Sequence, residues 1–350
     1  MLQQSQQLLS IVVPCFNEEA VIEETHSRMT RMAARLNELE YEIIYEDDGS
    51  QDGTAEILEQ LQRSDPCVRV LRLSRNFGHQ VAVTAGLEHA EGDVVALIDA
   101  DLQDPPEVIP QMVTRWREGY DVAYGERVSR DGETHFKVAT ARVFYRLMKH
   151  LTETRIPLDA GDFRVMDRRV VDALRAMPEC DRFVRGLVSW AGFRQIAVPY
   201  HRASRFAGRS KYPLSKMVRF AMDGIVGFSI APLRAVMGLG VVASLLAVLG
   251  TAYALALRTF TNEQIASGTA LLLGVLFMGG VQLVSVGIVG EYVGRSYEQS
   301  KRRPLYFVRE RMGFEEAPTS LRERRDALPR RELERATRLS VVKERGRATP

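Results

Sequence analysis

Four short hydrophobic runs punctuate the first third of the chain, and each is followed at once by polar residues. The runs are LLSIVV, YEIIYE, VRVLRL and DVVALI, which end at Val13, Glu46, Leu73 and Ile98. The segments between them carry apolar residues at helical spacing, as in residues 55–61. Continuous apolar strands that alternate with helices predict a parallel, doubly wound α/β sheet.

In such a sheet, ligands bind beyond the carboxyl ends of the strands. The polar residues at these ends therefore form the candidate site: Asn17-Glu18, Asp47-Asp48, Ser74-Arg75-Asn76 and Asp99-Ala100-Asp101. Turn formation explains Gly49 and Ser50. It does not explain the two adjacent acids Asp47 and Asp48, which can accept hydrogen bonds from a base and a ribose.

The strongest local signal is Asp99-Ala100-Asp101. In an extended chain, residues two apart lie on the same side, so both carboxylates would face one point. Two carboxylates repel each other unless a cation lies between them, and a hard divalent ion, Mg²⁺ or Mn²⁺, shared with a diphosphate fits oxygen ligands. Gln103 follows on the same face and can add an oxygen. An acidic turn leading into Pro105-Pro106 is the structural alternative.

Two uncharged runs, residues 235–257 and 265–290, lie near the C-terminal end. At about 1.5 Å per residue, a helix of either length crosses the ~30 Å hydrocarbon layer of a bilayer. Lysines and arginines flank the pair on both outer sides, which predicts cytoplasmic flanks and a short external loop. The GLGVVA stretch at 238–243 matches a dinucleotide-binding pattern, but it lies inside a span and is discounted.

These features divide the chain into four parts. Residues 1–212 are expected to form the α/β catalytic domain, 213–234 an interfacial amphipathic helix, and 235–293 two transmembrane helices. Residues 294–350 are expected to form a charged cytoplasmic tail, partly disordered. The net charge of +2 gives no case for nucleic acid. Three scattered cysteines without a CxxC pair predict neither a disulfide framework nor a zinc site.

Several motifs together resemble a known family. IVVPCFNEE, EDDGSQDGT, RNFGHQVAVTAGL and GDVVALIDADLQDPPE, in that order, resemble family-two glycosyltransferases of the GT-A fold. GDFRVMDRRV, RFVRGLVSWAGF and RFAGRSKYPLSKM narrow the resemblance to the polyisoprenyl-phosphate branch, which includes bactoprenol glucosyltransferases and dolichyl-phosphate mannose synthase. The resemblance covers about residues 8–300. Glu46 is a small departure, since a neutral residue usually precedes the acid pair.

The resemblance implies inverting transfer of one sugar from a nucleotide sugar, UDP-glucose above others, to undecaprenyl phosphate. It places this reaction at the cytoplasmic face of the inner membrane, in a multi-pass protein with both termini cytoplasmic. Galactose, N-acetylhexosamine, mannose and modified arabinose stay open as the sugar. Small residues in the spans, including Gly274 and Gly279-Gly280, also permit a homo-oligomer.

The expected site residues fall into four sets, which bind the nucleotide sugar, bind the metal, act in catalysis and bind the lipid phosphate. The resemblance implies the nucleotide-sugar set, which is Pro14, Phe16, Glu18, Asp47, Asp48, Asn76, Asp99 and Asp101. The metal set is Asp99, Asp101 and Gln103, with Mg²⁺ or Mn²⁺ as cofactor. Asp101 and Asp162 are expected to be catalytic, and Asp162 can orient hydroxyl groups or pair structurally with Arg164 or Arg168.

A lipid phosphate would need arginines and a hydroxyl donor close to the membrane. RFAGRSKY, directly before the expected interfacial helix, offers both, although positive-inside anchoring accounts for part of its charge. The phosphate-binding set is Arg205, Ser210 and Lys211, with Arg127 and Arg130 on a second basic loop. A phosphate monoester is largely dianionic at neutral pH, so it needs alignment more than a strong base.

Two other functions compete. A processive polysaccharide synthase carries a QxxRW element and more spans, whereas here Trp190 ends RGLVSW and two spans are present. A non-catalytic membrane scaffold would not need Asp48, Asp99, Asp101 and the basic loop together.

Overall fold

The computed structural model describes residues 7–128, 160–180, 182–202, 231–260 and 267–314. The chain separates into two compact units, Met1–Met312 and Gly313–Pro350, and the features below belong to the first. Its strands are β1 (Gln7–Cys15), β2 (Leu39–Asp47), β3 (Val68–Leu73), β4 (Val94–Leu97), β5 (Val122–Arg127), β6 (Ala160–Asp167), β7 (Gln195–Tyr200) and β8 (Val308–Met312). Its helices are α1 (Ile22–Ala33), α2 (Thr54–Ser64), α3 (His79–His89), η1 (Pro106–Val108), α4 (Ile109–Arg117), α6 (Arg168–Ala176), α7 (Val184–Trp190), α9 (Ala231–Phe260) and α10 (Ser267–Ser300).

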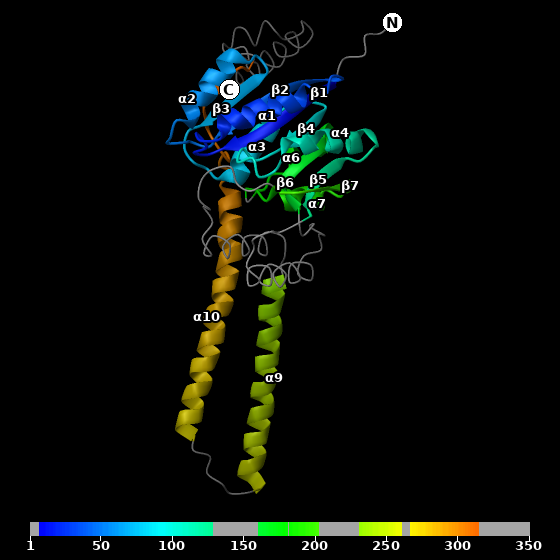
Figure 1. Cartoon of the computed structure of the whole chain (residues 1–350). Helices are drawn as coiled ribbons and strands as arrows, with labels where there is room; N and C mark the ends of the chain where they lie inside the picture. The colour runs from blue at the N-terminus through cyan, green and yellow to red at the C-terminus, as the bar shows by residue number, and fades with distance from the viewer. Residues whose placement is uncertain (1–6, 129–159, 181, 203–230, 261–266, 315–350) are drawn as a thin grey trace, which may run out of the picture. The chain divides into compact units, whose positions relative to one another are not determined.

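The strands form one eight-stranded sheet in the order β7-β5-β6-β4-β1-β2-β3-β8 (Figure 1). β3, β2, β1 and β4 are parallel, whereas β6 runs antiparallel between β4 and β5. The predicted parallel sheet is confirmed for the first four strands. Because the chain passes from β3 on one side of β1 to β4 on the other, the order reverses at β1. This switch point is where open α/β sheets bind ligands.

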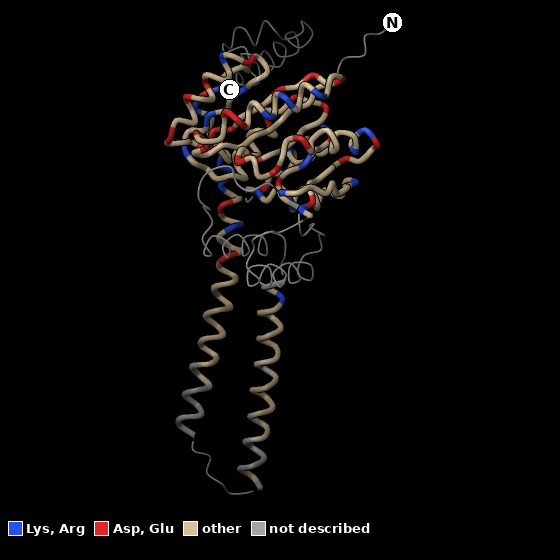
Figure 2. Tube along the Cα trace, in the orientation of Figure 1, with Lys and Arg blue, Asp and Glu red and all other residues tan. Residues whose placement is uncertain are grey.

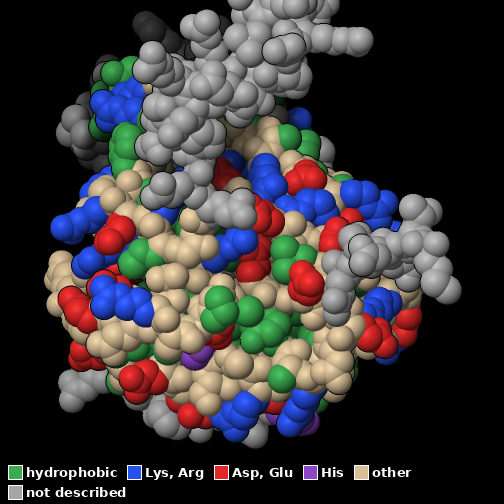
Figure 3. All heavy atoms as spheres, turned by 90° about the horizontal axis from the view of Figure 1, so that it is seen from above, with side chains coloured by type: hydrophobic (Ala, Val, Ile, Leu, Met, Phe, Trp, Pro, Cys, Tyr) green, Lys and Arg blue, Asp and Glu red, His purple; other side chains and the backbone are tan. Residues whose placement is uncertain are grey.

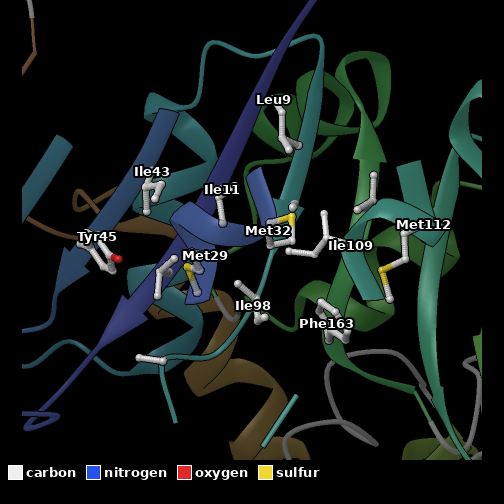
Figure 4. Close-up of a cluster of buried hydrophobic side chains, with 14 of the residues drawn as sticks. Leu9, Ile11, Met29, Met32, Ile43, Tyr45, Ile98, Ile109, Met112 and Phe163 are labelled. Atoms are coloured by element: carbon white, nitrogen blue, oxygen red, sulfur yellow. The ribbon is translucent and has the colours of Figure 1, made fainter. Parts of the chain in front are cut away.

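Helices cover both faces of the sheet. α1, α2 and α4 pack on one face, while α3, α6 and α7 pack on the other. The central strands are buried from both sides, which explains why their sequences are continuously apolar rather than alternating. Met29 and Met32 from α1 and Ile109 from α4 belong to the same buried cluster as the strand residues Ile11 and Ile43 (Figure 4).

α9 and α10 are of a different kind. The stretches Leu233–Gly250 and Phe277–Ser300 are long and apolar enough to cross a membrane, with mean hydropathy of 2.0 and 1.3, and none of either stretch is buried. Charged residues, frequent throughout the α/β domain, are nearly absent from α9 and from the first part of α10 (Figure 2). By length and composition, both helices therefore match the spans expected from the sequence.

Two boundaries differ from expectation. α10 continues to Ser300 rather than ending at 293, and residues 308–312 form β8, which joins the catalytic sheet. Part of the segment expected as a charged tail is thus an integral strand. The expected interfacial helix at 213–234 lies outside the described residues except for 231–234, which open α9.

Candidate active site

The first two strands end in loops that are hydrogen-bonded to each other. Asn17, a non-glycine residue with φ of 54°, donates its amide N–H to Ser50 Oγ at 3.0 Å, and its Oδ1 accepts from Gln51 N at 2.8 Å. Glu18 N donates to Thr54 Oγ1 at 2.8 Å. These contacts hold the loop after β1 against the β2–α2 turn, which brings two of the segments predicted to bind the nucleoside next to each other.

Asp48 is held by main-chain amides from a third loop. Its carboxylate accepts hydrogen bonds from Phe77 N at 2.7 Å and Gly78 N at 2.9 Å. Burial raises the pKa of Asp48, and these two amides partly oppose the rise. Gly78 has φ of 102°, a left-handed conformation that favours glycine, so the loop geometry depends on that residue.

Asp47 faces into the fold. It is fully buried, its Oδ1 accepts from Ser50 N at 2.9 Å, and its Oδ2 lies 3.5 Å from Arg72 Nε. These contacts give Asp47 a part in shaping the turn. Its expected contact with the nucleotide sugar stays a prediction, as does that of Asn76, which is exposed on the Ser74–Gly78 loop.

The Asp99–Asp101 pair lies in a turn rather than on extended chain. β4 ends at Leu97, and the backbone of Leu102 adopts a φ of 57°. The same-side argument from strand geometry therefore does not apply. Instead the turn is fixed locally, because Gln103 N donates to Asp101 Oδ1 at 3.1 Å. A left-handed non-glycine residue at this point is the kind of strain that collects at functional sites.

Asp99 is a carboxylate in need of a counter-charge. Its Oδ1 is buried without a hydrogen-bond partner among the described residues, and His79 Nε2 lies 3.6 Å away. Burial raises the pKa of Asp99 to about 6, against the effect of His79 and together with repulsion from Asp162, Asp104 and Asp101. The surrounding protein thus leaves negative charge only partly balanced here.

Asp162, on β6, is gripped by three side chains. Arg185 Nε donates to its Oδ1 at 2.7 Å, while His79 Nε2 and Gln80 Nε2 both lie 3.1 Å from its Oδ2. Burial alone would raise the pKa of Asp162, but Arg185 and His79 hold it well below its ordinary value. Asp162 is therefore a fixed anion and a poor base.

His79 bridges the two acidic centres. Burial opposes its charging, but the carboxylates of Asp99 and Asp162 raise the pKa of His79 to about 9. The structural partners considered for Asp162, Arg164 and Arg168, bind main-chain carbonyls instead. The motif RNFGHQ contained His79 and Gln80, yet only the fold shows that α3 brings them to β6, and that α7 brings Arg185.

A second cluster surrounds the buried Asp104. Its Oδ1 accepts a hydrogen bond from Tyr200 Oη, and Arg127 Nη2 and Arg202 Nε lie 3.8 and 3.9 Å from it. Arg127 Nε also donates to Tyr200 Oη at 3.2 Å. Arg202 Nη2 donates to Gln103 Oε1 at 2.7 Å, so two arginines stand beside the acidic turn.

Of the predicted phosphate-binding residues, Arg127 is placed in this cluster next to the acidic turn. Arg130, Arg205, Ser210 and Lys211 lie outside the described residues. Over the face seen in Figure 3, acidic and basic side chains are interspersed rather than gathered into one charged area.

The residues present fit a hard divalent cation. Asp99 offers a buried carboxylate oxygen without a hydrogen-bond partner among the described residues, and Asp101 follows on the same turn. No group of three or more His, Cys, Asp or Glu side chains with metal-binding geometry occurs within the described part of the chain. Gln103 can join Asp99 and Asp101 only by sharing or releasing its bond to Arg202.

An acidic turn beside the switch point of this sheet is the arrangement of a GT-A glycosyltransferase. The sequence model for glycosyl transferase family 2 matches residues 10–175. An uncharacterized glycosyltransferase of Bacillus subtilis, YkcC, is 47% identical over 87% of this chain and 94% of its own length. The chain belongs to glycosyl transferase family 2 and is a glycosyltransferase.

Two other relatives have names that state an activity. The bactoprenol glucosyl transferase of Shigella phage SfV is 40% identical, and the prophage bactoprenol glucosyl transferase homolog of Escherichia coli K12 is 38% identical. Each alignment covers 86% of this chain and 98% of the relative. Among solved structures, glucosyl-3-phosphoglycerate synthase of Mycobacterium tuberculosis in complex with Mn²⁺, UDP and phosphoglyceric acid is 20% identical, with a TM-score of 0.43 over 63% of this chain and 76% of that one.

Proposed function

We propose that this enzyme transfers a single sugar, glucose from UDP-glucose before other candidates, to a polyprenyl phosphate. The observation that carries the proposal is the similarity to bactoprenol glucosyl transferases, which extends over 86% of the chain and 98% of the relatives' length. The family model matches residues 10–175, whereas these alignments run over 301 residues, so the likeness to the bactoprenol enzymes extends well beyond the part matched by the family as a whole.

The donor would bind at the switch point. Pro14 near the end of β1, Phe16 and Glu18 just after it, and Asp48 after β2 are proposed to line the nucleoside pocket; hydrogen bonds between the β1 and β2 loops hold these segments together. Asp99 and Asp101, with Gln103 as a further oxygen donor, would hold Mg²⁺ or Mn²⁺ against the diphosphate. When bound, that ion neutralises the charge that develops on the departing nucleoside diphosphate.

The acceptor supplies its own nucleophile. A phosphate oxygen attacks the anomeric carbon while the bond from that carbon to the diphosphate breaks on the opposite face, so the configuration inverts. Arg127 and Arg202, fixed by Asp104, can orient an anion beside the acidic turn. Arg130, Arg205, Ser210 and Lys211 are proposed to complete the phosphate site.

Asp162 acts in this scheme as a charge that organises its neighbours. Because Arg185, His79 and Gln80 hold it as an anion, it is suited to orient a sugar hydroxyl group as an acceptor and not to remove a proton from the phosphate. Asp101 is proposed to be catalytic through the divalent cation that it would help to hold at the leaving diphosphate.

We also propose that α9 and α10 span the inner membrane, with the catalytic domain and both termini in the cytoplasm. Their hydropathy supports this, as do the basic residues outside each span. A polyprenyl phosphate resides in the bilayer, so a membrane-anchored enzyme meets its acceptor at the surface where that phosphate lies.

The proposal is tested by presenting the purified enzyme with two matched lipids. One is undecaprenyl phosphate and the other is undecaprenol, which has the same chain but no phosphate. With UDP-glucose and Mg²⁺ or Mn²⁺, UDP release should depend on the phosphorylated lipid and be near background with the alcohol. Equal release with both lipids, or with neither under any nucleotide sugar of a panel, would contradict the acceptor assignment.

A further inference from the structure

The segment that follows the second membrane-type helix is built into the catalytic sheet. After α10 ends at Ser300, the chain forms β8 at the outer edge of the sheet, antiparallel to β3, with Met312 opposite Val70 and Val308 opposite Leu73. Just beyond the end of β3, Ser74 N donates to Phe307 O at 2.9 Å. We call residues 304–312 the return segment.

The side chains of the return segment alternate between packing and exposure. Tyr306 and Val308 pack against a buried cluster of Leu73, Ala82 and Ala85, together with Phe77. Phe307, between them, is 59% exposed. The inward face of the return segment therefore rests on the end of β3 and on α3, whereas the side chain of Phe307 does not.

Polar contacts reinforce the same attachment. Tyr306 Oη donates to Glu88 Oε2 at 2.5 Å, and burial together with this carboxylate raises the pKa of Tyr306. Arg311 Nη2 lies 2.7 Å from His89 Nε2. Both partners are in the last turn of α3. Together with the packing on Ala82 and Ala85, these contacts attach the return segment to α3 between Ala82 and His89.

The return segment packs on elements that also form the candidate active site. The Ser74–Gly78 loop, which continues from β3, supplies the two amides that hold Asp48. α3 begins at His79, and the side chains of its first two residues, His79 and Gln80, contact Asp162. Phe77 links the two regions, because its amide donates to Asp48 while its side chain packs against the same buried cluster as Tyr306 and Val308.

We infer that the return segment is a positioning element of the donor site, which couples the end of α10 to the loop that binds Asp48. The inference rests on the proposed donor site and adds to it a part from the far end of the chain. When the Phe77 side chain is packed, the Ser74–Gly78 loop is already ordered and loses less conformational entropy as the nucleotide binds. Loosening this packing should therefore weaken donor binding specifically.

The test compares two substitutions on neighbouring positions of the full-length enzyme. Val308→Ala removes packing from the inward face, and Phe307→Ala removes an exposed side chain of the same strand while leaving its main-chain bond to Ser74 N intact. UDP in the presence of Mn²⁺ is the binding probe, measured by calorimetry without lipid. Hydrogen exchange of the peptide covering residues 74–78 is the second readout.

We expect Val308→Ala to weaken UDP binding about fivefold, which corresponds to ~1 kcal/mol, and to speed amide exchange at Phe77 and Gly78. Turnover at saturating donor and the KM for undecaprenyl phosphate should stay within about twofold of the unsubstituted enzyme. Phe307→Ala should change neither readout. Tyr306→Phe, which keeps the ring and loses the bond to Glu88, should give a smaller change in the direction of Val308→Ala.

Unchanged UDP affinity in Val308→Ala would overturn the inference, even if exchange at residues 74–78 accelerated. Equal losses in donor affinity, lipid KM and turnover would also overturn it, because a general loss of stability acts on all three. The failure of the proposed function looks different. If the unsubstituted enzyme bound no UDP, the donor assignment would fall and the inference that rests on it would fall too, whereas failure of the inference alone leaves UDP binding by the unsubstituted enzyme intact.

Discussion

Replacing Gln80 with Glu tests whether Asp162 works as a fixed anion. The Gln80 side chain has two roles, because its Nε2 donates to Asp162 Oδ2 at 3.1 Å while its Oε1 accepts from Val184 N at 2.9 Å. Glutamate has the same shape and keeps the second bond. It replaces the first by an oxygen facing an oxygen, in a site where Asp162 is 5% exposed.

The size of the effect follows from the distance. Two unit charges separated by 3.1 Å repel by about 5 kcal/mol at an effective dielectric constant of ~20. A proton on the introduced carboxyl group relieves this repulsion and restores a donor toward Asp162. The variant should therefore work at acid pH, where that proton is present, and lose activity as pH rises. If none of the repulsion were relieved, the fraction of enzyme that keeps the intact arrangement around Asp162 would fall by about a thousandfold or more, and activity would fall with it.

The assay is a pH–rate profile for sugar transfer at saturating lipid, from mildly acid to alkaline pH. Gln80→Met is the matched control, because it has similar length but can neither donate nor accept strongly, and its loss should be the same at every pH. Thermal melting of each variant at each pH separates lost activity from unfolding. A Gln80→Glu profile parallel to that of the unsubstituted enzyme would refute the assignment of Asp162 as an anion held by this amide.

Three further predictions follow from other parts of the molecule. Glu46 is fully buried, and burial raises its pKa well above 4.5. The folded state therefore loses stability as pH rises through the pKa that Glu46 has in the folded protein. Glu46→Gln should raise the melting temperature most at alkaline pH and least near pH 4. Asp101→Asn should abolish transfer while the protein stays folded, and near-normal turnover of that variant in chelator-treated buffer would contradict the metal assignment. Cysteines placed at Thr261 and Gln299 in a variant without native cysteines should differ, with an impermeant reagent labelling only the first from outside intact cells; labelling of both, or of neither, would contradict the two-span topology.

The strand ends were predictable from the sequence because burial on both faces leaves a plain signal. The runs ending at Val13, Glu46 and Leu73 correspond to β1, β2 and β3, and the acidic residues Glu18 and Asp48 follow the first two of them. DVVALI is less well matched, since β4 ends at Leu97 and the Asp99–Asp101 pair sits in a turn with a left-handed Leu102. No period of hydrophobic residues encodes such a turn.

The set of side chains that holds Asp162 was not predictable in the same way. Its partners come from α3 and α7, and polar side chains on a helix surface are ordinarily solvated, so nothing local marks His79, Gln80 and Arg185 as a set. Strand β8 was not predicted from the sequence, for a related reason. Its sequence, VRERM, is charged and follows a long apolar helix, so it looks like a tail, and only its pairing with β3 shows otherwise.

The central claim is that one sugar passes to the phosphate of a membrane lipid. It is tested most directly by the mass of the lipid recovered after the purified enzyme has consumed UDP-glucose in the presence of undecaprenyl phosphate. The account predicts a product heavier than the starting lipid by one hexose residue and no larger adduct, even after prolonged reaction with excess donor. A ladder of several hexoses, or UDP release with the lipid mass unchanged, would contradict it.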